Sequence, residues 1–211
     1  MKILALSDVH QREENLKSIM QKVQNFKIEL AVIAGDLTNY GDSTDASKIV
    51  DILKAPKILA VPGNLDGSNV LEFLEKSGLS LHKKLISYNG FDFCGFGGGL
   101  LGKTGELLSS ELEIENCLRK IVTKGSILVT HLPPKETSLD LAEGEHIGSL
   151  AVKKIILEKR PFMHICGHAH EAHGRIKVGE TVCINVASVK EGFASIIDIR
   201  DNKVQVKRIS A

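Results

Sequence analysis

The 211-residue chain has almost no excess of either charge, because 27 Lys and Arg residues face 26 Asp and Glu residues and leave a net charge of +1. This balance argues against general binding to nucleic acid or other polyanions, which usually requires a basic domain. It leaves room for one phosphate-containing ligand, since a local site can carry charge that the whole chain does not. The composition therefore indicates no nucleic-acid partner.

Long hydrophobic runs are also missing. No apolar stretch approaches the roughly 20 residues that a membrane-spanning helix needs. The apolar start of the chain, residues 1–6, meets polar residues at Ser7 and Asp8, which makes it too short for a signal peptide. The sequence therefore predicts a cytoplasmic protein without a membrane span.

Paired cysteines are absent as well. The four cysteines, none of them in a C-x-x-C pair, are Cys94, Cys117, Cys166 and Cys183. Because they lie in apolar strand-like runs or, for Cys117, in a helical pattern, we expect reduced cysteines in the core. The chain has no repeats or low-complexity tract, and its 43% hydrophobic and 25% charged residues are ordinary for a soluble enzyme. We expect residues 1–211 to form a single domain.

Short apolar runs alternate with helical patterns in the first half of the chain. Apolar residues at helical spacing predict helices over 13–26 and 44–53, and Ser68 is expected to cap a third helix that ends near Gly78. The strands expected around them cover residues 3–6, 30–34 and 58–61. The run 30–34 shows no polar–apolar alternation, which indicates that both of its faces are buried.

The second half contains more strands. Asn89-Gly90 predicts a tight hairpin turn between strands at 85–87 and 91–96. The remaining expected elements are helices over 109–122 and 150–157 and strands over 127–130, 163–166, 174–178, 181–186, 193–199 and 204–209. Alternating strands and helices followed by hairpins predict an α/β fold, with mixed sheets in a sandwich and helices outside.

Each of five apolar strands ends in a short polar or glycine-containing cluster. These clusters contain Asp8 and His10; Gly35 and Asp36; Gly63, Asn64 and Asp66; His131; and Gly167, His168 and His170. Ligands of open α/β sheets bind in the crevice beyond the carboxyl ends of the strands, so we expect these side chains to converge there. Each cluster alone is compatible with a turn or a helix cap, and it is their combination that indicates a shared site.

The convergent side chains offer oxygen and nitrogen donors and no thiolate. His168 and His170 are two residues apart, so in an extended segment they would point the same way. Such a donor set suits Mn, Fe, Ni, Zn or Co rather than a structural zinc–thiolate site. Seven protein ligands are too many for one ion and fit two, with Asp36 as a bridge. Two divalent ions would attract a phosphate oxygen and lower the pKa of a bridging water, the arrangement for hydrolysing a phosphate ester.

The five clusters resemble the five sequence blocks of the calcineurin-like metallophosphoesterase superfamily. The matching segments, in order over residues 3–186, are Asp8-Val9-His10, Gly35-Asp36, Gly63-Asn64, His131 and Gly167-His168-Ala169-His170. The resemblance implies an α/β fold in which two mixed β-sheets pack as a sandwich flanked by helices. The ligands it implies are Asp8, His10, Asp36 and His170 for one metal, and Asp36, Asn64, His131 and His168 for the other. The short chain is most similar to compact bacterial and archaeal phosphodiesterases, which implies a small phosphate-ester substrate.

One position departs from the family's pattern. The third block of the family often reads Gly-Asn-His, and its histidine helps to protonate the leaving group, whereas this chain has Leu65. Leucine cannot transfer a proton, so an acid-catalysed step would need another group. Asp66 is one candidate, with orientation of a neighbour or helix capping as its alternative role, and His146 and His173 are two more. The residues that we assign to catalysis are Asn64, Asp66 and His131.

Other conspicuous residues have simpler interpretations. Gly97-Gly98-Gly99 is not a nucleotide-binding fingerprint, because no helical pattern follows it directly. It is typical of a loop that leaves a strand, and the functional alternative is a backbone that approaches an anionic substrate. Arg175 and Lys103 offer positive charge, but the sequence does not place them. His82 and His164 are expected to be ordinary sheet or surface residues.

The sequence leaves three functions open. The first is a phosphodiesterase with two divalent metal ions, with Mn as the first choice and Ni, Fe, Zn or Co as alternatives. The second is a phosphomonoesterase or nucleotidase, and the third is a metal-binding interaction scaffold without catalysis. The size of the chain and the missing histidine favour the diesterase, and the complete set of ligands argues against a scaffold. The sequence does not determine the oligomeric state.

Overall fold

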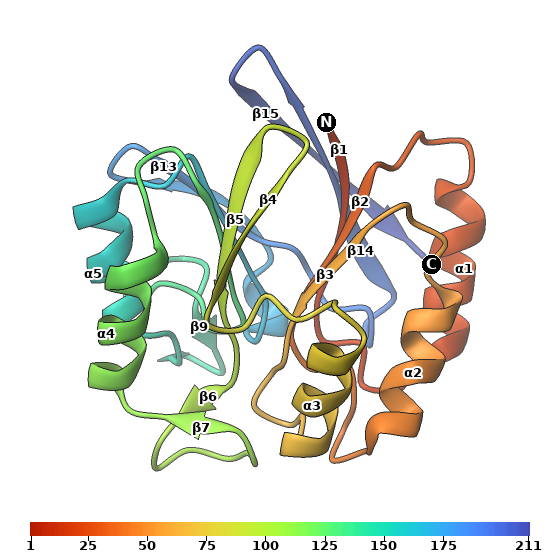
Figure 1. Cartoon of the computed structure of the whole chain (residues 1–211), viewed down its shortest axis with the longest axis horizontal. Helices are drawn as coiled ribbons and strands as arrows, with labels where there is room; N and C mark the ends of the chain where they lie inside the picture. Colours follow the sequence, from red (N-terminus) through yellow and green to blue (C-terminus); the bar gives the residue numbers. More distant parts are fainter.

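Two mixed β-sheets lie at the centre of the computed structural model, which describes residues 1–211 (Figure 1). The first sheet has the strand order β15-β14-β1-β2-β3, in which β1, β2 and β3 are parallel and β14 runs antiparallel to both β1 and β15. Its strands are β1 (Lys2–Leu6), β2 (Leu30–Ala34), β3 (Ile58–Val61), β14 (Phe193–Arg200) and β15 (Lys203–Ser210).

The second sheet has the order β12-β13-β11-β8-β5-β4. Its central strands are parallel, and the edge strands β12 and β4 pair antiparallel with their neighbours. The strands are β4 (Lys84–Tyr88), β5 (Phe91–Phe96), β8 (Ile127–Thr130), β11 (Met163–Cys166), β12 (Gly174–Val178) and β13 (Thr181–Asn185). Two further two-stranded ribbons are formed by β6 (Gly99–Leu100) with β7 (Leu108–Ser109), and by β9 (Leu141–Ala142) with β10 (Glu145–His146).

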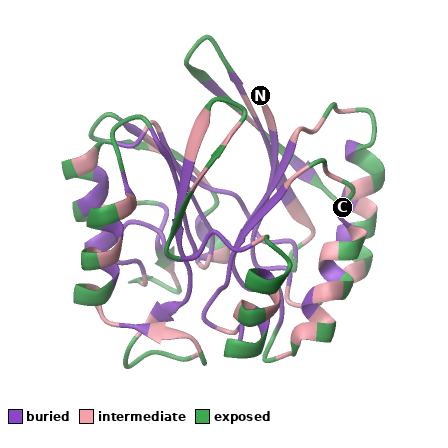
Figure 2. Ribbon diagram, in the orientation of Figure 1, coloured by how far each residue is buried: buried purple, intermediate pink, exposed green.

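Helices cover the outer face of each sheet (Figure 1). The first sheet packs against α1 (Glu13–Val23), α2 (Ser43–Ile52) and α3 (Ser68–Lys76), and the second against α4 (Glu111–Ile121) and α5 (Leu150–Lys159). A third apolar cluster fills the space between the two sheets. Burial accordingly runs through both sheets in Figure 2, while the outer turns of the helices are exposed. The predicted fold class, two mixed sheets in a sandwich flanked by helices, is confirmed.

The central strands are apolar on both faces because each lies between a helix layer and the opposite sheet. Leu4 and Leu6 of β1 belong to the cluster under α1–α3, whereas Ile3 and Ala5 belong to the cluster between the sheets. All five residues of β2 are buried, as its unalternating sequence predicts. Since the parallel strands all run in the same direction within a sheet, their carboxyl ends meet at one edge.

Most predicted element boundaries agree with the structure within one or two residues, and the limits of β2, β3, β8 and β11 are as predicted. Asn89 and Gly90 form the predicted hairpin turn between β4 and β5, with φ values of 50° and 80°. Helix α1 is shorter than predicted and ends at Val23. The N–H of Phe26 donates back to the carbonyl of Val23 at 2.9 Å, so the chain turns there instead of continuing the helix.

The prediction that Ser68 caps α3 was wrong. The helix begins at Ser68 itself, Gly67 is the N-cap, and no side chain caps this end. Glu106 crowds the turn, because a Cβ atom at Gly67 would lie 2.4 Å from the Glu106 Oε2 atom. A side chain at position 67 would therefore displace the end of the Glu106 side chain.

Three cysteines and His164 are buried within strands, and His82 is buried just before β4. All four cysteines are free, and Cys94, Cys166 and Cys183 are buried in the core as predicted, whereas Cys117 on α4 is half-buried. His82 and His164 are both buried, so neither is a surface residue. His164 Nε2 lies 2.7 Å from Thr130 Oγ1, and His82 Nδ1 accepts a hydrogen bond from the Gly97 N–H at 2.9 Å. No helix combines the length and the apolar character needed to span a bilayer.

Candidate metal centre

Loops at the carboxyl ends of five strands converge at one edge of the sandwich. The strands β1, β2, β3, β8 and β11 are followed, in that order, by Asp8 and His10, by Asp36, by Asn64, by His131, and by His168 and His170. Asp8, His10, Asp36 and His168 have left-handed backbones, with φ values of 52°, 46°, 51° and 69°. Asp and His tolerate this conformation better than most residues, and backbone strain of this kind gathers at functional sites.

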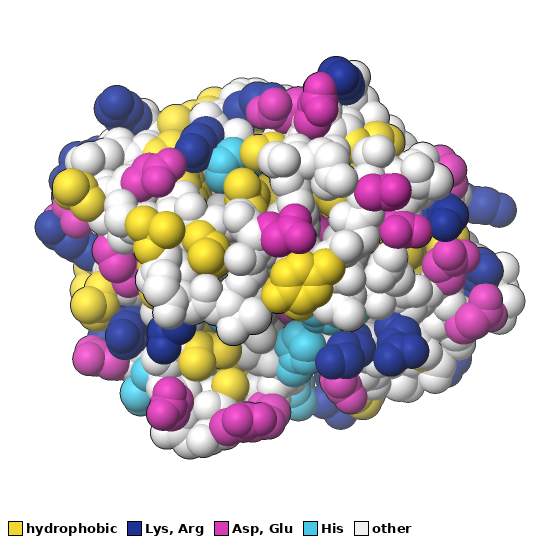
Figure 3. Space-filling model, turned by 90° about the horizontal axis from the view of Figure 1, so that it is seen from below, with side chains coloured by type: hydrophobic (Ala, Val, Ile, Leu, Met, Phe, Trp, Pro, Cys, Tyr) yellow, Lys and Arg dark blue, Asp and Glu magenta, His cyan; other side chains and the backbone are white.

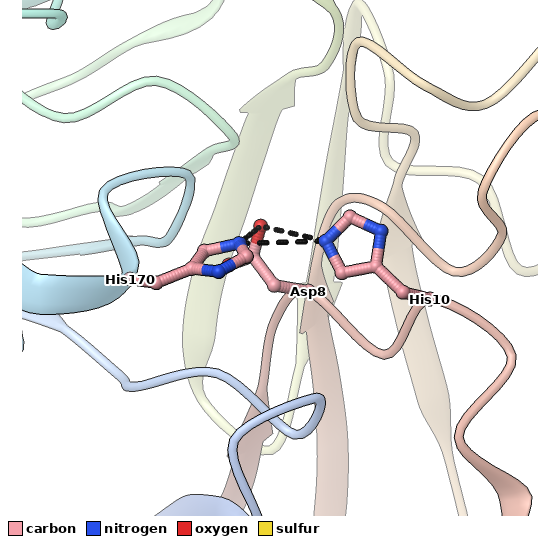
Figure 4. A group of neighbouring side chains, drawn as sticks. All are labelled: Asp8, His10 and His170. Atoms are coloured by element: carbon pink, nitrogen blue, oxygen red, sulfur yellow. Dashed lines mark hydrogen bonds and ion pairs between the residues drawn. The ribbon is translucent and has the colours of Figure 1, made fainter. Parts of the chain in front are cut away.

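Three of these side chains, Asp8, His10 and His170, form a first cluster (Figure 4). Asp8 Oδ1 lies 3.1 Å from His170 Nε2 and 3.8 Å from His10 Nε2, and the two imidazole nitrogens are 3.4 Å apart. Asp8 is buried, and its Oδ1 atom has no hydrogen-bond partner. An orphaned buried carboxylate oxygen that faces two imidazole nitrogens is the signature of a cation site, because burial without a partner is costly.

Asn64, His131 and His168 form a second cluster. His131 Nε2 lies 2.9 Å from Asn64 Oδ1 and 3.1 Å from His168 Nδ1. Backbone carbonyls bond to the side-chain atoms of His131 and Asn64 that point away from the cluster. His131 Nδ1 is 2.8 Å from the carbonyl of Ala34, and Asn64 Nδ2 donates to the carbonyl of Thr104 at 3.0 Å. These contacts fix the tautomer of His131 and turn the amide oxygen of Asn64 toward the cluster.

Asp36 lies between the two clusters. Its Oδ2 atom is 3.8 Å from His10 Nε2 and 3.6 Å from His131 Nε2, whereas Oδ1 accepts a hydrogen bond from the Leu65 N–H at 2.9 Å. One carboxylate therefore faces both clusters. All seven predicted ligands are brought together, and their nitrogen and oxygen donors fit divalent ions such as Mn, Fe, Ni, Zn or Co.

The segment after β11 is not extended, contrary to the sequence prediction. His168 is left-handed, and His170 begins the short 3₁₀ helix η1 (His170–Ala172). The His168 N–H donates to Asp8 Oδ2 at 3.0 Å, and the Asn185 amide donates to the carbonyls on either side of it. As a result the two histidines do not point the same way: His168 joins the second cluster and His170 the first.

Burial and neighbouring charges shift the pKa values of the candidate ligands in different directions. Burial lowers the pKa of His10 to about 4 and that of His168 to about 3. Burial acts the same way on His170, but the Asp8 carboxylate outweighs it and the pKa is raised. Burial, together with repulsion from Asp8, raises the pKa of Asp36 to about 7. Neutral imidazoles are the form that coordinates a metal, and a bound cation would relieve the repulsion between the carboxylates.

Two glycines allow these loops to approach each other. A Cβ atom at Gly63 would lie 1.9 Å from Asp36 Oδ1, and one at Gly35 would lie 2.3 Å from His131 Nδ1. Gly35 also has a φ of 95°, which favours glycine. The glycines of the second and third sequence blocks are therefore required by the close packing of the ligands.

Comparison with known proteins now places the chain in a family. Residues 1–172 match the sequence description of the calcineurin-like phosphoesterases. The chain belongs to this family. It is 28% identical to the uncharacterized protein MJ1162 of Methanocaldococcus jannaschii, over 97% of this chain and 94% of that protein. Membership makes the protein a phosphoesterase of a family that implies divalent metal ions.

Solved structures share the fold of this phosphoesterase at low sequence identity. TT1561 of Thermus thermophilus superposes with a TM-score of 0.78 and is 20% identical, with 98% of this chain and 97% of that chain covered. A structure described as a novel archaeal phosphodiesterase has a TM-score of 0.56 and 17% identity, with 100% of both chains covered. Both comparisons establish a common fold over nearly the whole chain.

The three groups considered as proton donors lie outside the cluster of ligands. Asp66 is fully buried, and its two oxygens accept hydrogen bonds from the N–H groups of Leu37, Thr38 and Gly63 and from the Thr38 hydroxyl. It thus ties the loop after β2 to the loop after β3. His146 is exposed and lies 2.9 Å from Asp140 Oδ1. His173 is exposed and contacts Arg208.

The structure places three further residues that the sequence did not single out. Arg12, Asn39 and Lys190 line a pocket of about 260 Å³ together with Leu65 and the exposed edges of the ligands. Of these three residues, only Arg12 could have been noticed in the sequence, because it follows the candidate ligand His10 by two residues. Lys190 lies 20 positions beyond His170, and nothing local marks it. Of the two cations considered earlier, Lys103 lines a separate pocket next to Asn64 and His168, whereas Arg175 bonds the carbonyl of Val204 on β15.

Proposed function

We propose that the protein is a dinuclear metal-dependent phosphodiesterase. The observation that carries this proposal is the position of Asp36, whose single Oδ2 atom lies within 4 Å of an imidazole nitrogen from each cluster. Each cluster with Asp36 offers four donors, and neither set is complete without it. Two divalent ions held there would polarise the phosphate ester and lower the pKa of the attacking water.

The protein's own residues would hold and orient the reacting groups. Asn64 and His131 are fixed by backbone carbonyls on their far sides, so their donor atoms need little rearrangement during turnover. Asp66 would keep the loops of Asp36 and Asn64 in register through its four hydrogen bonds. Its oxygens are occupied as acceptors, which makes it a positioning residue rather than a proton donor.

Leu65 is the basis for preferring diesters with good leaving groups. It lines the pocket beside Asp36 and His168 and has no proton to give. Since Asp66, His146 and His173 all have other partners, we infer that the leaving group departs without general acid catalysis. The fold shared with a structure described as an archaeal phosphodiesterase agrees with a diester substrate.

Two finer features belong to the same proposal. Mn is our first choice of metal, with Ni, Fe, Zn or Co as alternatives, because the donors are carboxylate, amide and imidazole without thiolate. Four free cysteines, three of them buried, favour a reducing compartment such as the cytoplasm.

The deciding experiment combines metal analysis with a substrate screen. Purified protein would be analysed for bound metals, stripped with chelator, and assayed on chromogenic monoesters and diesters with each metal added back. We expect two metals per chain and higher kcat/KM on diesters. A preference for monoesters would make the protein a monoesterase, and no turnover with any metal would favour the scaffold.

A series of diesters with different phenol leaving groups tests the role of Leu65. Without an acid, the rate should fall steeply as the leaving-group pKa rises. General acid catalysis contributes typically 10²- to 10⁴-fold, so Leu65→His should help the poorest leaving groups most and flatten the slope. A shallow slope in the unmodified protein would show that another proton donor acts.

A further inference from the structure

Two pockets of opposite charge meet at His168 and His170. The 260 Å³ pocket on the α1 side holds Arg12 and Lys190, and we call it the basic pocket. A pocket of about 390 Å³ on the other side contains Glu143, Glu145 and Glu171 and no basic side chain. Figure 3 shows a group of histidine side chains on this face, with Lys and Arg side chains directly on one side and Asp and Glu side chains on the other.

The two cations of the basic pocket have unpaired charges on fixed backbone. The ion pairs of the centre join Asp8 and Asp36 only to histidines, so neither Arg12 nor Lys190 is neutralised. The N–H of Lys190 donates to the carbonyl of Asp8 at 2.9 Å, and the N–H of Arg12 donates to the carbonyl of Val9 at 2.9 Å. Both residues are thereby anchored to the loop that carries the first cluster, while their exposed side chains face the pocket.

The charge in this pocket exceeds what one diester phosphate can balance. A phosphodiester carries a single negative charge at the reacting phosphorus, and the metal ions already attract it. Asp36 is the one carboxylate that lines the basic pocket, against two cationic side chains. A guanidinium and an ammonium on anchored loops match a second phosphate, because both form charge-assisted hydrogen bonds to phosphate oxygens.

We propose that Arg12 and Lys190 form a subsite for a second phosphate group, carried on a substituent of the scissile diester. This inference rests on the proposed phosphodiesterase function and narrows its substrate class to diesters with an additional phosphate. The other substituent would face the glutamates, so it is neutral or cationic. The subsite also fixes which of the two ester bonds lies opposite the attacking water and is cleaved, since the substrate can bind in one direction only.

A matched pair of substrates tests the subsite. Thymidine 5′-(p-nitrophenyl phosphate) and its 3′-phosphorylated analogue are both diesters with the same leaving group, and they differ only in the extra phosphate. With the metal-loaded full-length protein, we expect kcat/KM to be about 10- to 100-fold higher for the 3′-phosphorylated substrate. The preference should shrink as salt concentration rises, because the two cations are exposed.

Variants that remove one charge test whether Arg12 and Lys190 cause the preference for the 3′-phosphorylated substrate. Arg12→Gln and Lys190→Gln should each reduce the preference several-fold, and the double variant should bring it close to one. Lys103→Gln, which removes a cation from the neighbouring pocket, is the matched control and should keep the preference. Equal kcat/KM for both substrates in the parent protein, or a preference that survives in the double variant, would overturn the inference.

Calorimetry gives a readout that is independent of turnover. The parent protein should bind thymidine 3′,5′-bisphosphate about 10-fold or more tightly than thymidine 5′-monophosphate, and the double variant should bind the two alike. Equal affinities in the parent would contradict the subsite. Absence of hydrolysis of either diester with any metal, with the affinity difference present, would instead refute the proposed catalytic function while supporting the subsite.

Discussion

The two clusters of the metal centre differ in how firmly the protein holds them. In the second cluster, the far nitrogen of His131 and the amide nitrogen of Asn64 both bond to backbone carbonyls. In the first cluster, neither His10 nor His170 bonds to a backbone carbonyl, and the His170 side chain is 26% exposed. The comparison teaches that one half of the centre is pre-organised and the other half can adapt.

Chelation should produce the largest effect and separate the two halves. We expect the metal of the first cluster to leave before that of the second, since orientation of ligands by outer contacts typically raises metal affinity 10- to 100-fold. Hydrolysis should cease completely after the first loss. The stripped protein should stay folded, because its core is large, with a Tm lower by roughly 10 °C through loss of bound ligand.

The check is a chelator titration followed by metal analysis, activity and circular dichroism. Release of both metals in one step would contradict the expected difference in metal affinity between the two clusters. Activity that survives complete metal removal would contradict the proposed function.

Replacing the shared ligand should affect both halves at once. Asp36→Asn removes the charge that faces both clusters, so we expect weaker binding of both metals and a loss of about 10³-fold or more in kcat/KM. Asp42→Asn is the matched control, because asparagine caps a helix as well as aspartate and Asp42 is the exposed N-cap of α2. Loss of only one metal in Asp36→Asn would show that this residue does not bridge.

A substitution in the β6–β7 loop should weaken the second cluster alone. Gly105 has a φ of 143°, and a Cβ atom there would lie 2.5 Å from the Asn64 carbonyl oxygen. Gly105→Ala should displace Asn64 and cost about 10- to 100-fold in affinity for one metal. The matched control in the same loop is Gly102→Ala, where φ is 81° and no atom lies within 4 Å of the added Cβ. Equal losses of metal affinity in the two variants would show that the contact of Gly105 with Asn64 does not control the orientation of Asn64.

The smallest effect concerns the support under the second cluster. Burial lowers the pKa of His164 to about 3, and its Nε2 contacts Thr130 next to His131. The folded state favours the neutral imidazole of His164, so between pH 6.5 and 3 the unfolded chain binds more protons than the folded chain. The free energy of unfolding therefore falls as the pH drops from 6.5 to 3. Protonation of this one imidazole changes the free energy of unfolding by up to about 1.4 kcal/mol per pH unit.

We therefore expect His164→Gln to be less stable at pH 7 but to lose stability less steeply below pH 6.5. Urea unfolding of metal-free protein between pH 4.5 and 7.5 measures this, with the exposed His173→Gln as the matched control. An equally steep loss in His164→Gln would contradict the assignment of this proton to His164.

Much of the fold follows from local sequence signals. The strands β2, β3, β8 and β11 are short apolar runs bounded by polar residues and buried on both faces, and their limits were predictable for that reason. The convergence of the ligand candidates followed from the common edge at which parallel strands end. These arguments need only the order of residues along the chain.

The remaining features depend on contacts between distant segments. The orientation of His168 is set by Asp8, 160 positions away, so an extended segment was a wrong expectation. The support of Asn64 comes from the carbonyl of Thr104, a group that no side chain identifies. Lys190 is exposed and reaches the centre only because its backbone bonds to Asp8. Such placements are decided by tertiary packing and have no local pattern.

The pairing of β1 has a consequence for synthesis of the chain. β1 lies between β2 and β14, and Lys2 pairs with Asp198 near the other end of the sequence. While the protein is being made, one edge of β1 stays without a partner until residues 193–200 emerge from the ribosome. Open strand edges recruit other chains and promote aggregation. The strand β14, which contributes no ligand, therefore has the role of closing this open edge of β1.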